Sequence, residues 1–474
     1  MDISVLGQLG GLTTIFTELY YWLTVVIMFF IHVGFCTYEV GVTRRKNVQH
    51  TLMKNTMLLP TVTLTFFLVG WWIYFGAVNG PWITGPVAEN ALTAMSVPWS
   101  ESMGVNMQDR INGVFWAAFL LFSWTTASIV SGSIIERVRT LAFLLCAAML
   151  GGVTWILDAA WGWSAAGWMT HYLGYHDAYA SGVVHGIAGG TALGFLVVLG
   201  PRIGKFGPNG EPRTIPLHNP WLTCLGLFLI YAGFWGFYAA CNIPIWDIDG
   251  TDASFFSATN IYLMPTTLSG ITFNFIMSLC GGLMVGYMVS KADPFWTYSG
   301  GLAGIITASA GNDLYHPVEA FVVGGVGVFV AYRLHYWVER RFKIDDGVGA
   351  VAVHGYAGSL GVAIAGFLLW GYPNVDPANG PGGLNYAWFG STPEGFPAIN
   401  PIGQIIGSFI MFWVLGFLPG WVLAKILDAL GWLRVPAEVE VAGLDTHGYG
   451  DAFPYLPQAE PEFERIQREA ASQR

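Results

Sequence analysis

The chain has 474 residues, of which 54% are hydrophobic and 11% are charged, and its formal net charge is −10. About a quarter of the residues of a soluble domain are charged, so this composition excludes an ordinary soluble protein and indicates an integral membrane protein. The acidic balance gives no sign of a nucleic-acid partner, and we expect none.

Long apolar runs recur along the chain, each close to the roughly 20 residues that a membrane-spanning helix requires. They predict eleven spans, which cover residues 19–41, 53–77, 112–134, 140–160, 180–200, 220–241, 259–290, 295–312, 318–338, 347–370 and 401–429. Basic clusters follow the odd-numbered spans, for example Arg44, Arg45 and Lys46 after the first and Arg340 and Arg341 after the ninth. Because basic loops stay in the cytoplasm, we predict an outer N-terminus and a cytoplasmic C-terminus in a cell (inner) membrane.

The chain divides into two parts of different composition. Residues 1–430 carry all the apolar runs and are predicted to form one membrane domain, whereas residues 431–474 turn polar and charged. A polar segment buries too little apolar surface to offset the entropy lost on ordering. We therefore expect residues 431–474 to be a cytoplasmic tail that is partly ordered at best.

One short motif occurs twice within the apolar sequence. Residues 184–189 read VHGIAG and residues 353–358 read VHGYAG, and an aspartate, Asp177 or Asp346, lies eight residues before each histidine. The two copies are 169 positions apart at both the aspartate and the histidine. Spans one to five and six to ten would then be duplicated halves, and an odd number of spans makes the second half enter from the opposite side. The predicted fold is an all-α polytopic membrane protein with eleven transmembrane helices, an inverted five-plus-five repeat plus a final helix.

The duplication places one imidazole in each half of the membrane domain, at His185 and His354. Ionisable residues cost about 2.5–3.5 kcal/mol at the centre of a membrane helix when charged, so they are usually functional. Matching helices of an inverted repeat place such residues at a shared interface near mid-membrane. The alternative is two structural histidines bonded to nearby carbonyls, but their repetition in register favours a pair.

A metal site or a membrane enzyme built on the two histidines is a second possibility. Neither a Glu-x-x-His pair nor a carboxylate cluster accompanies them within the predicted spans, so a metal would lack ligands. The cysteines are too widely spaced for a zinc motif and indicate small buried apolar residues; they are Cys36, Cys146, Cys224, Cys241 and Cys280. We expect no metal, no cofactor and no enzymatic activity.

Five motifs occur in order along almost the whole chain, and they are GFCTYEVGVTRRKNVQHTLMKN (34–55), IVSGSIIERVR (129–139), DAYASGVVHGIAGG (177–190), KIDDGVGAVAVHGYAG (343–358) and LRVPAEVEVAGLDTHGYG (433–450). Together they resemble the ammonium transporter (Amt/Mep/Rh) family, in its bacterial Amt-like form. The resemblance implies ammonium/ammonia as the substrate, membrane lipid as the surroundings and a homotrimer with one pore per subunit. It also implies a regulatory tail that could help a GlnK-type signalling protein to bind at the cytoplasmic face.

The resemblance also assigns roles to individual residues. The pore lining would be His185 and His354, the outer gate two stacked rings, Phe122 and Phe237, and the ammonium-recruiting residues Trp161, Phe122, Asp177 and Cys241. Asp346 would cap its helix, and Asp177 is weighed evenly between capping a helix and supporting the cation electrostatically. The chain departs from many bacterial relatives in having Cys241 for a serine, Gly349 for an aspartate, and a longer segment between Trp161 and Asp177 that adds Trp163 and Trp168.

The implied mechanism follows from the cost of desolvating ions. Ammonium and potassium are similar in size, and an unpaired ion in an apolar medium costs many kcal/mol, but only ammonium can lose its charge by giving up a proton. A cation–π cage of Trp161 and Phe122 would hold the cation. The neutral amine would then pass the histidines, which titrate as a pair and can relay the proton separately. Electrogenic transport is favoured over passive conduction, and a non-conducting ammonium sensor (transceptor) or an Rh-like gas channel are the alternatives.

Overall fold

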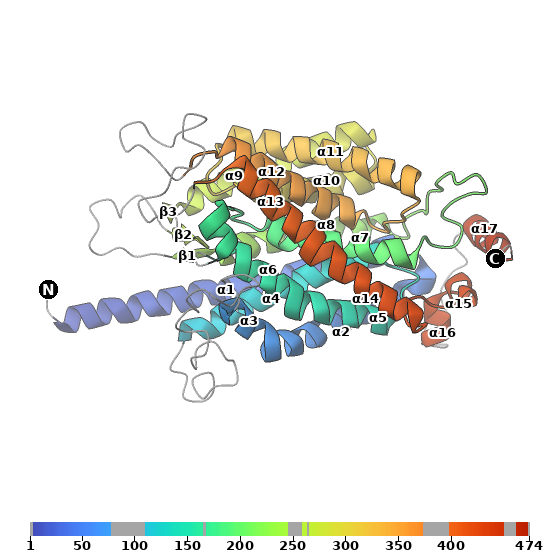
Figure 1. Cartoon of the computed structure of the whole chain (residues 1–474), viewed down its shortest axis with the longest axis horizontal. Coiled ribbons are helices and arrows are strands. Elements are labelled where there is room, and N and C mark those ends of the chain that lie inside the picture. The colour runs from blue at the N-terminus through green and yellow to red at the C-terminus, as the bar shows by residue number, and fades with distance from the viewer. Residues whose placement is uncertain are drawn as a thin grey trace.

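The computed structural model describes residues 3–76, 110–164, 167–244, 258–262, 265–372, 398–449 and 461–472. Long helices run side by side along the long axis of the molecule and form one bundle, with the last short helices gathered at one end (Figure 1). Short 3-10 or π turns, labelled η, interrupt or begin several of the helices.

The helices up to the middle of the chain are α1 (Ile3–Val42), η1 (Arg45–Asn47), α2 (Val48–Thr65), η2 (Phe66–Gly70), α3 (Trp71–Gly76), α4 (Arg110–Ser133), α5 (Thr140–Met149), η5 (Leu150–Thr154), α6 (Trp155–Gly162), η6 (Met169–Leu173), η7 (Ser181–Gly186), α7 (Ile187–Leu199) and α8 (Pro220–Ala240). Three strands follow, β1 (Asn242–Pro244), β2 (Ala258–Asn260) and β3 (Pro265–Thr266). The remaining helices are α9 (Leu268–Ser290), α10 (Pro294–Ala308), α11 (Pro317–Phe342), η8 (Val351–Tyr356), α12 (Ala357–Leu368), α13 (Pro401–Phe409), η9 (Ile410–Phe417), α14 (Leu418–Ala429), α15 (Ala437–Ala442), α16 (Leu444–Gly448) and α17 (Pro461–Ala471).

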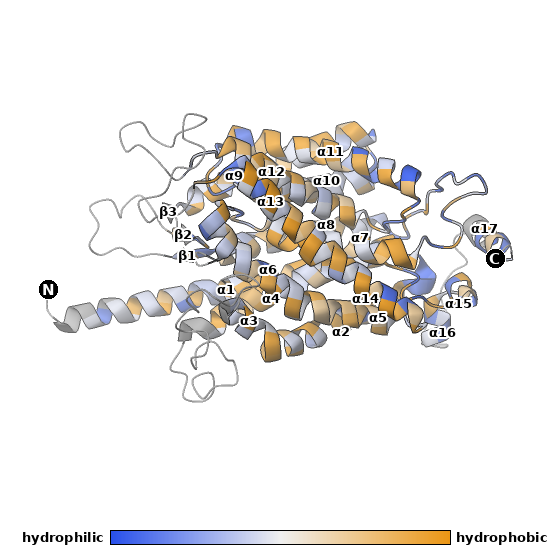
Figure 2. Cartoon of the chain, in the orientation of Figure 1, coloured by the Kyte–Doolittle hydropathy of each residue, from blue (hydrophilic) through white to orange (hydrophobic). Residues whose placement is uncertain are grey.

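Ten helical rods of the described residues are long and apolar enough to cross a membrane. Hydrophobic residues dominate the middle of these rods, and hydrophilic residues gather towards their ends (Figure 2). The prediction of a multi-pass membrane protein is therefore confirmed. The remaining predicted span, 295–312, corresponds to α10, which has 15 residues and is about 22 Å long at 1.5 Å per residue. The count of eleven spans stays a prediction.

Two details of the prediction are wrong. The span expected at 259–290 begins only at Leu268, because the Thr267 hydroxyl accepts a hydrogen bond from the Gly270 amide and starts the helix there. The residues before it contribute to a small antiparallel sheet of order β1-β2-β3, in which Asn242 is opposite Asn260 and Ala258 is opposite Thr266. The fold is thus mostly helical and not strictly all-α.

Several helices start at a polar cap followed by proline, which suits the first helical position because it has no amide hydrogen to satisfy. The Asn219 side chain accepts from two amides at the start of α8, and the Asp293 side chain accepts from the Trp296 amide at the start of α10. The Asn400 side chain does the same for Gly403 in α13. These caps fix where each span begins.

Glycines allow the helices to pack closely. A Cβ atom at Gly34 in α1 would lie 2.6 Å from the Gly226 carbonyl oxygen, and one at Gly226 in α8 would lie 2.4 Å from the Tyr38 amide nitrogen. Membrane helices associate through such close backbone contacts because lipid supplies no hydrophobic driving force between them. α1 and α8 therefore pack directly against each other.

The C-terminal segment is more regular than its composition predicts. α15 and α16 lie at the same end of the bundle as η1. The Asp445 carboxylate accepts hydrogen bonds of 2.8 Å from the amides of both Gln49 and His50, and the Leu444 amide donates to Asn47 at 2.9 Å. Arg434 donates to the carbonyl oxygens of Leu199, the last residue of α7, and of Pro201. Residues 431–449 are therefore held on the basic end of the bundle.

Candidate functional site

The centre of the candidate site is a contact between two imidazole rings. His185 in η7 and His354 in η8 place their Nδ1 atoms 3.0 Å apart, a hydrogen-bonding distance. The ring centroids are 5.2 Å apart at an interplanar angle of 29°. Both side chains are buried, with 0% and 3% of their surfaces exposed. The structure thus brings together the two histidines that the repeated motif singled out.

The glycines of the motif allow this approach. A Cβ atom at Gly189 would lie 2.2 Å from the Gly355 Cα atom, and one at Gly358 would lie 2.1 Å from the Ser181 carbonyl oxygen. Contacts below 3.0 Å with backbone cannot be relieved by turning a side chain. Each helix therefore crosses the other at a glycine within one turn of its histidine, and a larger residue would push the imidazoles apart.

The Nδ1–Nδ1 contact determines what the pair can offer to a third molecule. One ring must donate the shared proton and the other must accept it, because a neutral imidazole carries one N–H. The Nε2 atom of the donating ring is then an acceptor, and the Nε2 atom of the other ring carries a proton and is a donor. Within the described residues, the Nε2 atom of His185 is buried and has no hydrogen-bond partner. A small polar molecule beside it would find an open hydrogen-bonding position.

The aspartate before each histidine lies at the start of that helix. The Asp177 carboxylate accepts from the amides of Ser181 and Gly182 at 2.7 Å and of Val183 at 3.0 Å, and from the Tyr175 hydroxyl at 3.2 Å. This geometry is that of a helix cap. With four donors on two oxygens, the carboxylate has little capacity left for direct contact with a cation.

Asp346 has the equivalent position in the second half. Its carboxylate accepts from the amides of Ala350 at 3.0 Å and Val351 at 2.8 Å, and from the Ser133 hydroxyl at 2.8 Å. Three residues after each aspartate the backbone takes a left-handed turn, at Ala180 with φ of 68° and at Gly349 with φ of 69°. The glycine at 349 suits this conformation, in which an L side chain is strained.

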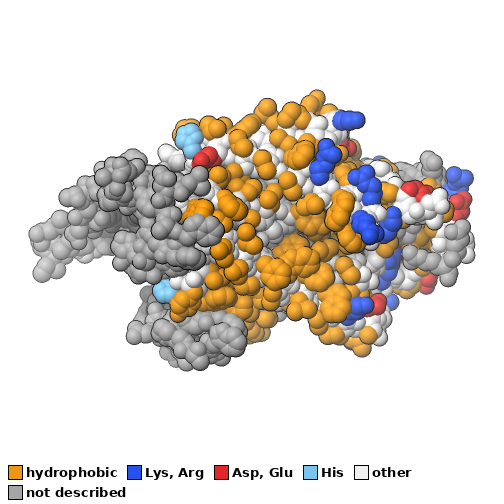
Figure 3. All heavy atoms as spheres, turned by 45° about the horizontal axis from the view of Figure 1, so that its top comes forward, with side chains coloured by type: hydrophobic (Ala, Val, Ile, Leu, Met, Phe, Trp, Pro, Cys, Tyr) orange, Lys and Arg blue, Asp and Glu red, His pale blue; other side chains and the backbone are white. Residues whose placement is uncertain are grey.

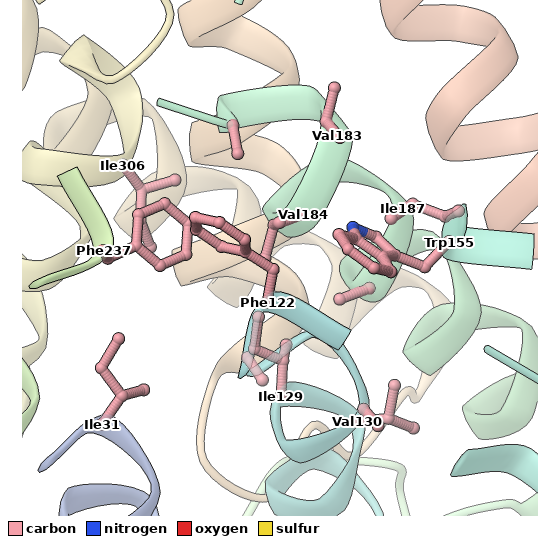
Figure 4. Close-up of a cluster of buried hydrophobic side chains, with 14 of the residues drawn as sticks. Ile31, Phe122, Ile129, Val130, Trp155, Val183, Val184, Ile187, Phe237 and Ile306 are labelled. Atoms are coloured by element: carbon pink, nitrogen blue, oxygen red, sulfur yellow. The ribbon is translucent and has the colours of Figure 1, made fainter. Parts of the chain in front are cut away.

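Aromatic rings cover the His185 side of the pair. His185 is stacked at 5.7 Å on Phe234 and at 5.8 Å on Phe237, two rings that stack on each other at 5.0 Å. Phe122 meets Phe237 at 4.6 Å and 88°, and both rings are fully buried among the apolar side chains of Figure 4. The expectation of a stacked Phe122–Phe237 pair is therefore wrong in geometry, because the rings meet edge to face, an arrangement that aromatic quadrupoles favour.

Trp161 does not join Phe122 in the described part of the chain. The indole of Trp161 packs on Trp168 at 5.7 Å, and Trp163 is the tryptophan that meets Phe122, at 4.7 Å and 82°. Trp163 is fully buried and donates to the Ala178 carbonyl oxygen at 3.3 Å. The ring that contacts Phe122 is therefore Trp163, and Trp161 belongs to an adjoining aromatic group, so the Trp161–Phe122 cage stays a prediction.

Cys241, the fourth residue expected at the outer site, lies one turn after Phe237 at the end of α8. Its thiol is buried and donates to the Phe237 carbonyl oxygen at 3.1 Å. Sulfur is a weak donor, so this bond mainly sets the direction of the side chain. Cys241 is thus adjacent to the aromatic group, and its hydrogen points back to its own helix.

A cavity of about 510 Å³ opens at the opposite end of the pair, beside Asp346 and Gly349. Its walls come from α10, α11 and residues 202–217, and they include Arg213, Trp296 and His335. Between this cavity and His354 lies a much smaller space of about 10 Å³, lined mainly by apolar groups. From this end, the approach to His354 therefore begins as a wide polar cavity. It narrows to a small apolar space next to the imidazole ring.

A network of buried ion pairs adjoins this cavity. Arg202 contacts Glu136 at 3.1 Å and Asp345 at 2.8 Å, and Arg44 contacts Glu136 at 2.7 Å. Burial would raise the pKa of both carboxyls, but the guanidinium groups beside them hold each pKa well below its usual range. Both carboxylates therefore stay ionised, and the network joins the loops that follow α4 and α7 to the loop that precedes η8.

Reasoning from the sequence missed Phe234 and Trp163. Phe234 is three residues before Phe237 on α8, so helical spacing could have placed both rings on the face towards His185. Trp163 follows the end of α6, where the chain leaves the helix, and no periodicity applies there. Within the described ranges, no three His, Cys, Asp or Glu side chains gather as a metal site would require.

The fold defines a multi-pass, mostly helical membrane protein with a pair of buried histidines at its centre. The sequence model of the Ammonium Transporter Family matches residues 19–453. The chain therefore belongs to the ammonium transporter family.

Named relatives agree with this family. The chain is 31% identical over 430 residues to ammonium transporter Amt2 of Methanocaldococcus jannaschii, a match that covers 89% of this chain and 87% of the relative. It is 29% identical over 434 residues to ammonium transporter Amt2 of Archaeoglobus fulgidus, covering 88% and 84%. These relatives are named as transporters and not as enzymes.

Solved structures share the fold. A protein described as Sensor Amt Protein matches with a TM-score of 0.73 and 22% identity, covering 93% of this chain and all of the other. Candida albicans Mep2 matches with a TM-score of 0.70 and 18% identity, covering 94% and 91%. At these identities the likeness supports the fold alone.

Proposed function

We propose that the chain carries ammonium across the membrane by conducting neutral ammonia past the His185–His354 pair. The single observation that carries this proposal is the buried Nδ1–Nδ1 contact, with an open Nε2 position on His185 within the described residues. Ammonia is both a donor and an acceptor, so it suits the pattern that the pair offers. Potassium has neither property, and it cannot leave water for an apolar path without a large cost.

The outer steps of this mechanism use the aromatic groups. Ammonium loses its proton among the rings around Phe122 and Phe237, which lie between the outer end and His185. Trp161 recruits the cation near Phe122, with Trp163 as an additional wall, while Asp177 supports the cation electrostatically and Cys241 lines the site with its thiol bonded to the Phe237 carbonyl oxygen. The imidazole pair relays the released proton separately, because two bonded histidines titrate as one unit. Net transport is then electrogenic.

The topology completes the proposal. Eleven helices cross the membrane as an inverted five-plus-five repeat plus a final helix, with the N-terminus outside and residues 431–474 in the cytoplasm. The matching left-handed turns at Ala180 and Gly349 support the repeat. The chain resides in the cell (inner) membrane as a homotrimer, and the docked segment 431–449 supports a regulatory tail where a GlnK-type protein could bind.

The test is current through the full-length protein reconstituted in liposomes, measured with ammonium and with potassium. The wild type is expected to give ammonium current only. His185→Ala and His354→Ala should lose selectivity or conduction, because either change removes the shared proton. His32→Ala is the matched control, since His32 is a buried imidazole that contacts Phe29 and Trp124 outside the pair.

The same measurement separates the alternatives. Ammonium binding without current in the wild type would indicate a sensor and overturn transport. Flux of ammonia without current would indicate passive conduction, as in the gas-channel alternative. Unchanged selective currents in both histidine variants would reject the pair as the filter.

A further inference from the structure

A long apolar groove lies on the surface of the bundle, away from the histidine pair. It has a volume of about 650 Å³ and runs between α7, α11, α12 and the rod formed by α13 and η9. Four large aromatic side chains on its walls are 44–57% exposed, and they are Trp337, Phe342, Phe409 and Trp413. An apolar hollow of this size on a membrane-spanning surface has to be filled by something apolar.

A basic side chain, that of Arg341, lies beside the groove. Val330, Leu334, Trp337 and Val338 line it along one stripe of α11. At about 100° per residue, Arg341 falls within that stripe, four residues after Trp337. The Arg341 guanidinium lies 5.8 Å from the ring centre of Phe342, which lines the groove. Lys and Arg side chains gather towards this end of the molecule (Figure 3).

Of the three basic residues at this end of α11, Arg341 is the one available to an anion. Arg340 donates to the Tyr336 carbonyl oxygen at 3.0 Å and lines the inner cavity instead. Lys343 donates to the Gly210 carbonyl oxygen and lies over the Phe206 ring. Within the described residues, no carboxylate pairs with Arg341, whose side chain is exposed.

We propose that the groove binds one anionic glycerophospholipid of the adjoining leaflet, with an acyl chain along α11 and the phosphate on Arg341. Charge complementarity selects this occupant, because an apolar groove beside an exposed guanidinium near the end of a membrane span matches a hydrocarbon chain joined to a phosphate. The acyl chain gains little free energy by moving from the bilayer into the groove, since the neighbouring lipid tails are as apolar as the groove. The headgroup therefore decides which lipid is held, and one basic residue near an anionic surface gives a preference of about fivefold.

The first experiment measures lipid binding to the delipidated full-length protein in detergent by native mass spectrometry. We expect phosphatidylglycerol to bind about fivefold more tightly than phosphatidylcholine, and Arg341→Ala to abolish that preference. Arg340→Ala is the matched control and should keep it. Soluble glycerol 3-phosphate should not compete with phosphatidylglycerol, because it has no acyl chain. Competition by glycerol 3-phosphate would assign the site to a free phosphate and overturn the proposal. Equal binding of both lipids to the wild type would also overturn it, as would an equal loss in both arginine variants.

The second experiment identifies what occupies the groove. A photoreactive p-benzoylphenylalanine in place of the exposed Phe409 should form an adduct with phosphatidylglycerol in mixed vesicles. An adduct with a second copy of the chain would show that the groove is a subunit interface and would overturn the proposal. Absence of a lipid adduct in phosphatidylglycerol vesicles would overturn it as well. Neither outcome depends on ammonium transport, so this inference and the proposed function can fail separately.

Discussion

The two ends of the histidine pair carry the same motif in different surroundings. At one end, Asp177 is held by three backbone amides and a tyrosine hydroxyl, beside a group of aromatic rings. At the other end, Asp346 has two amides and a serine hydroxyl, and the residue before it, Asp345, belongs to a network of buried ion pairs. The motif forms a helix start in both places. The two ends differ in what surrounds it, which is neutral aromatic rings at one end and buried ion pairs at the other.

This difference separates two ways of holding a buried carboxylate. Neutral donors at a helix start stabilise the charge through short hydrogen bonds and the helix dipole. Ion pairs do so through guanidinium groups whose own desolvation is costly, so that removing one partner leaves an uncompensated charge. The network end should therefore be far more sensitive to the loss of one side chain than the capped end.

Arg202→Ala is the largest expected disruption. It would leave both Glu136 and Asp345 without their shared guanidinium, and breaking a buried pair costs about 3–5 kcal/mol. A clear drop in the unfolding temperature of the detergent-solubilised protein is expected. Arg340→Ala, which removes an exposed arginine, should leave it almost unchanged. Equal unfolding temperatures for the wild type and Arg202→Ala would contradict the comparison.

Acid should unfold the network end in the same way as the substitution. The pKa of Glu136 and of Asp345 is depressed in the folded protein by the adjacent arginines, against the effect of burial, whereas an unfolded carboxyl has a pKa of about 4. A depressed pKa gives stability that is complete above the unfolded pKa and lost as the pH falls below it. The unfolding temperature should therefore fall below about pH 4, and Arg202→Ala should flatten that fall. An identical acid dependence in the variant would speak against the network as its cause.

The histidine pair could be predicted from the sequence because its evidence is linear. The two copies of the motif lie at a constant offset, and an inverted repeat brings equivalent residues together. The glycines four residues after His185 and His354 were visible too, although their role in the crossing needed the structure. Most spans followed from hydropathy alone, since a spanning helix has a minimum length.

Other features depend on contacts between distant segments, which no periodicity reveals. Trp163 occupies the place expected for Trp161 because the chain leaves its helix between them. Two strands of the small sheet, β2 and β3, fall almost entirely in residues that hydropathy assigned to a span, and Thr267 sets where the helix begins. The tail docks through specific hydrogen bonds, such as those that the Asp445 carboxylate accepts from the Gln49 and His50 amides at the start of α2, whereas composition shows only that the tail is polar.

Removing each aspartate cap tests the comparison at the motif itself. Replacing a cap by alanine costs about 0.5–2 kcal/mol. Asp177→Ala should lie near 2 kcal/mol, because it frees three buried amides, and Asp346→Ala near 1 kcal/mol, because it frees two. Chemical denaturation of the two variants measures the difference. Asparagine replacements retain one acceptor oxygen, so their free energies of unfolding should lie between those of the wild type and the alanine variants at both ends. A larger loss of stability in Asp346→Ala than in Asp177→Ala would refute the idea that the number of capped amides sets the cost.

Cys241→Ser is the smallest change we expect, and it tests the aromatic end of the site separately from the histidine pair. The thiol donates to the Phe237 carbonyl oxygen one turn earlier, and a hydroxyl can make the same bond at a shorter distance. Stability should change by less than about 0.5 kcal/mol, as for substitutions that disturb no packing. Because the hydrogen stays on the helix carbonyl in both forms, the concentration of ammonium that gives half-maximal current should change less than about twofold, an increment of roughly 0.4 kcal/mol. A tenfold gain in affinity for ammonium would instead mean that the side chain of residue 241 turns its lone pairs towards the cation. Cation binding at the aromatic end would then depend on a polar ligand as well as on the aromatic rings.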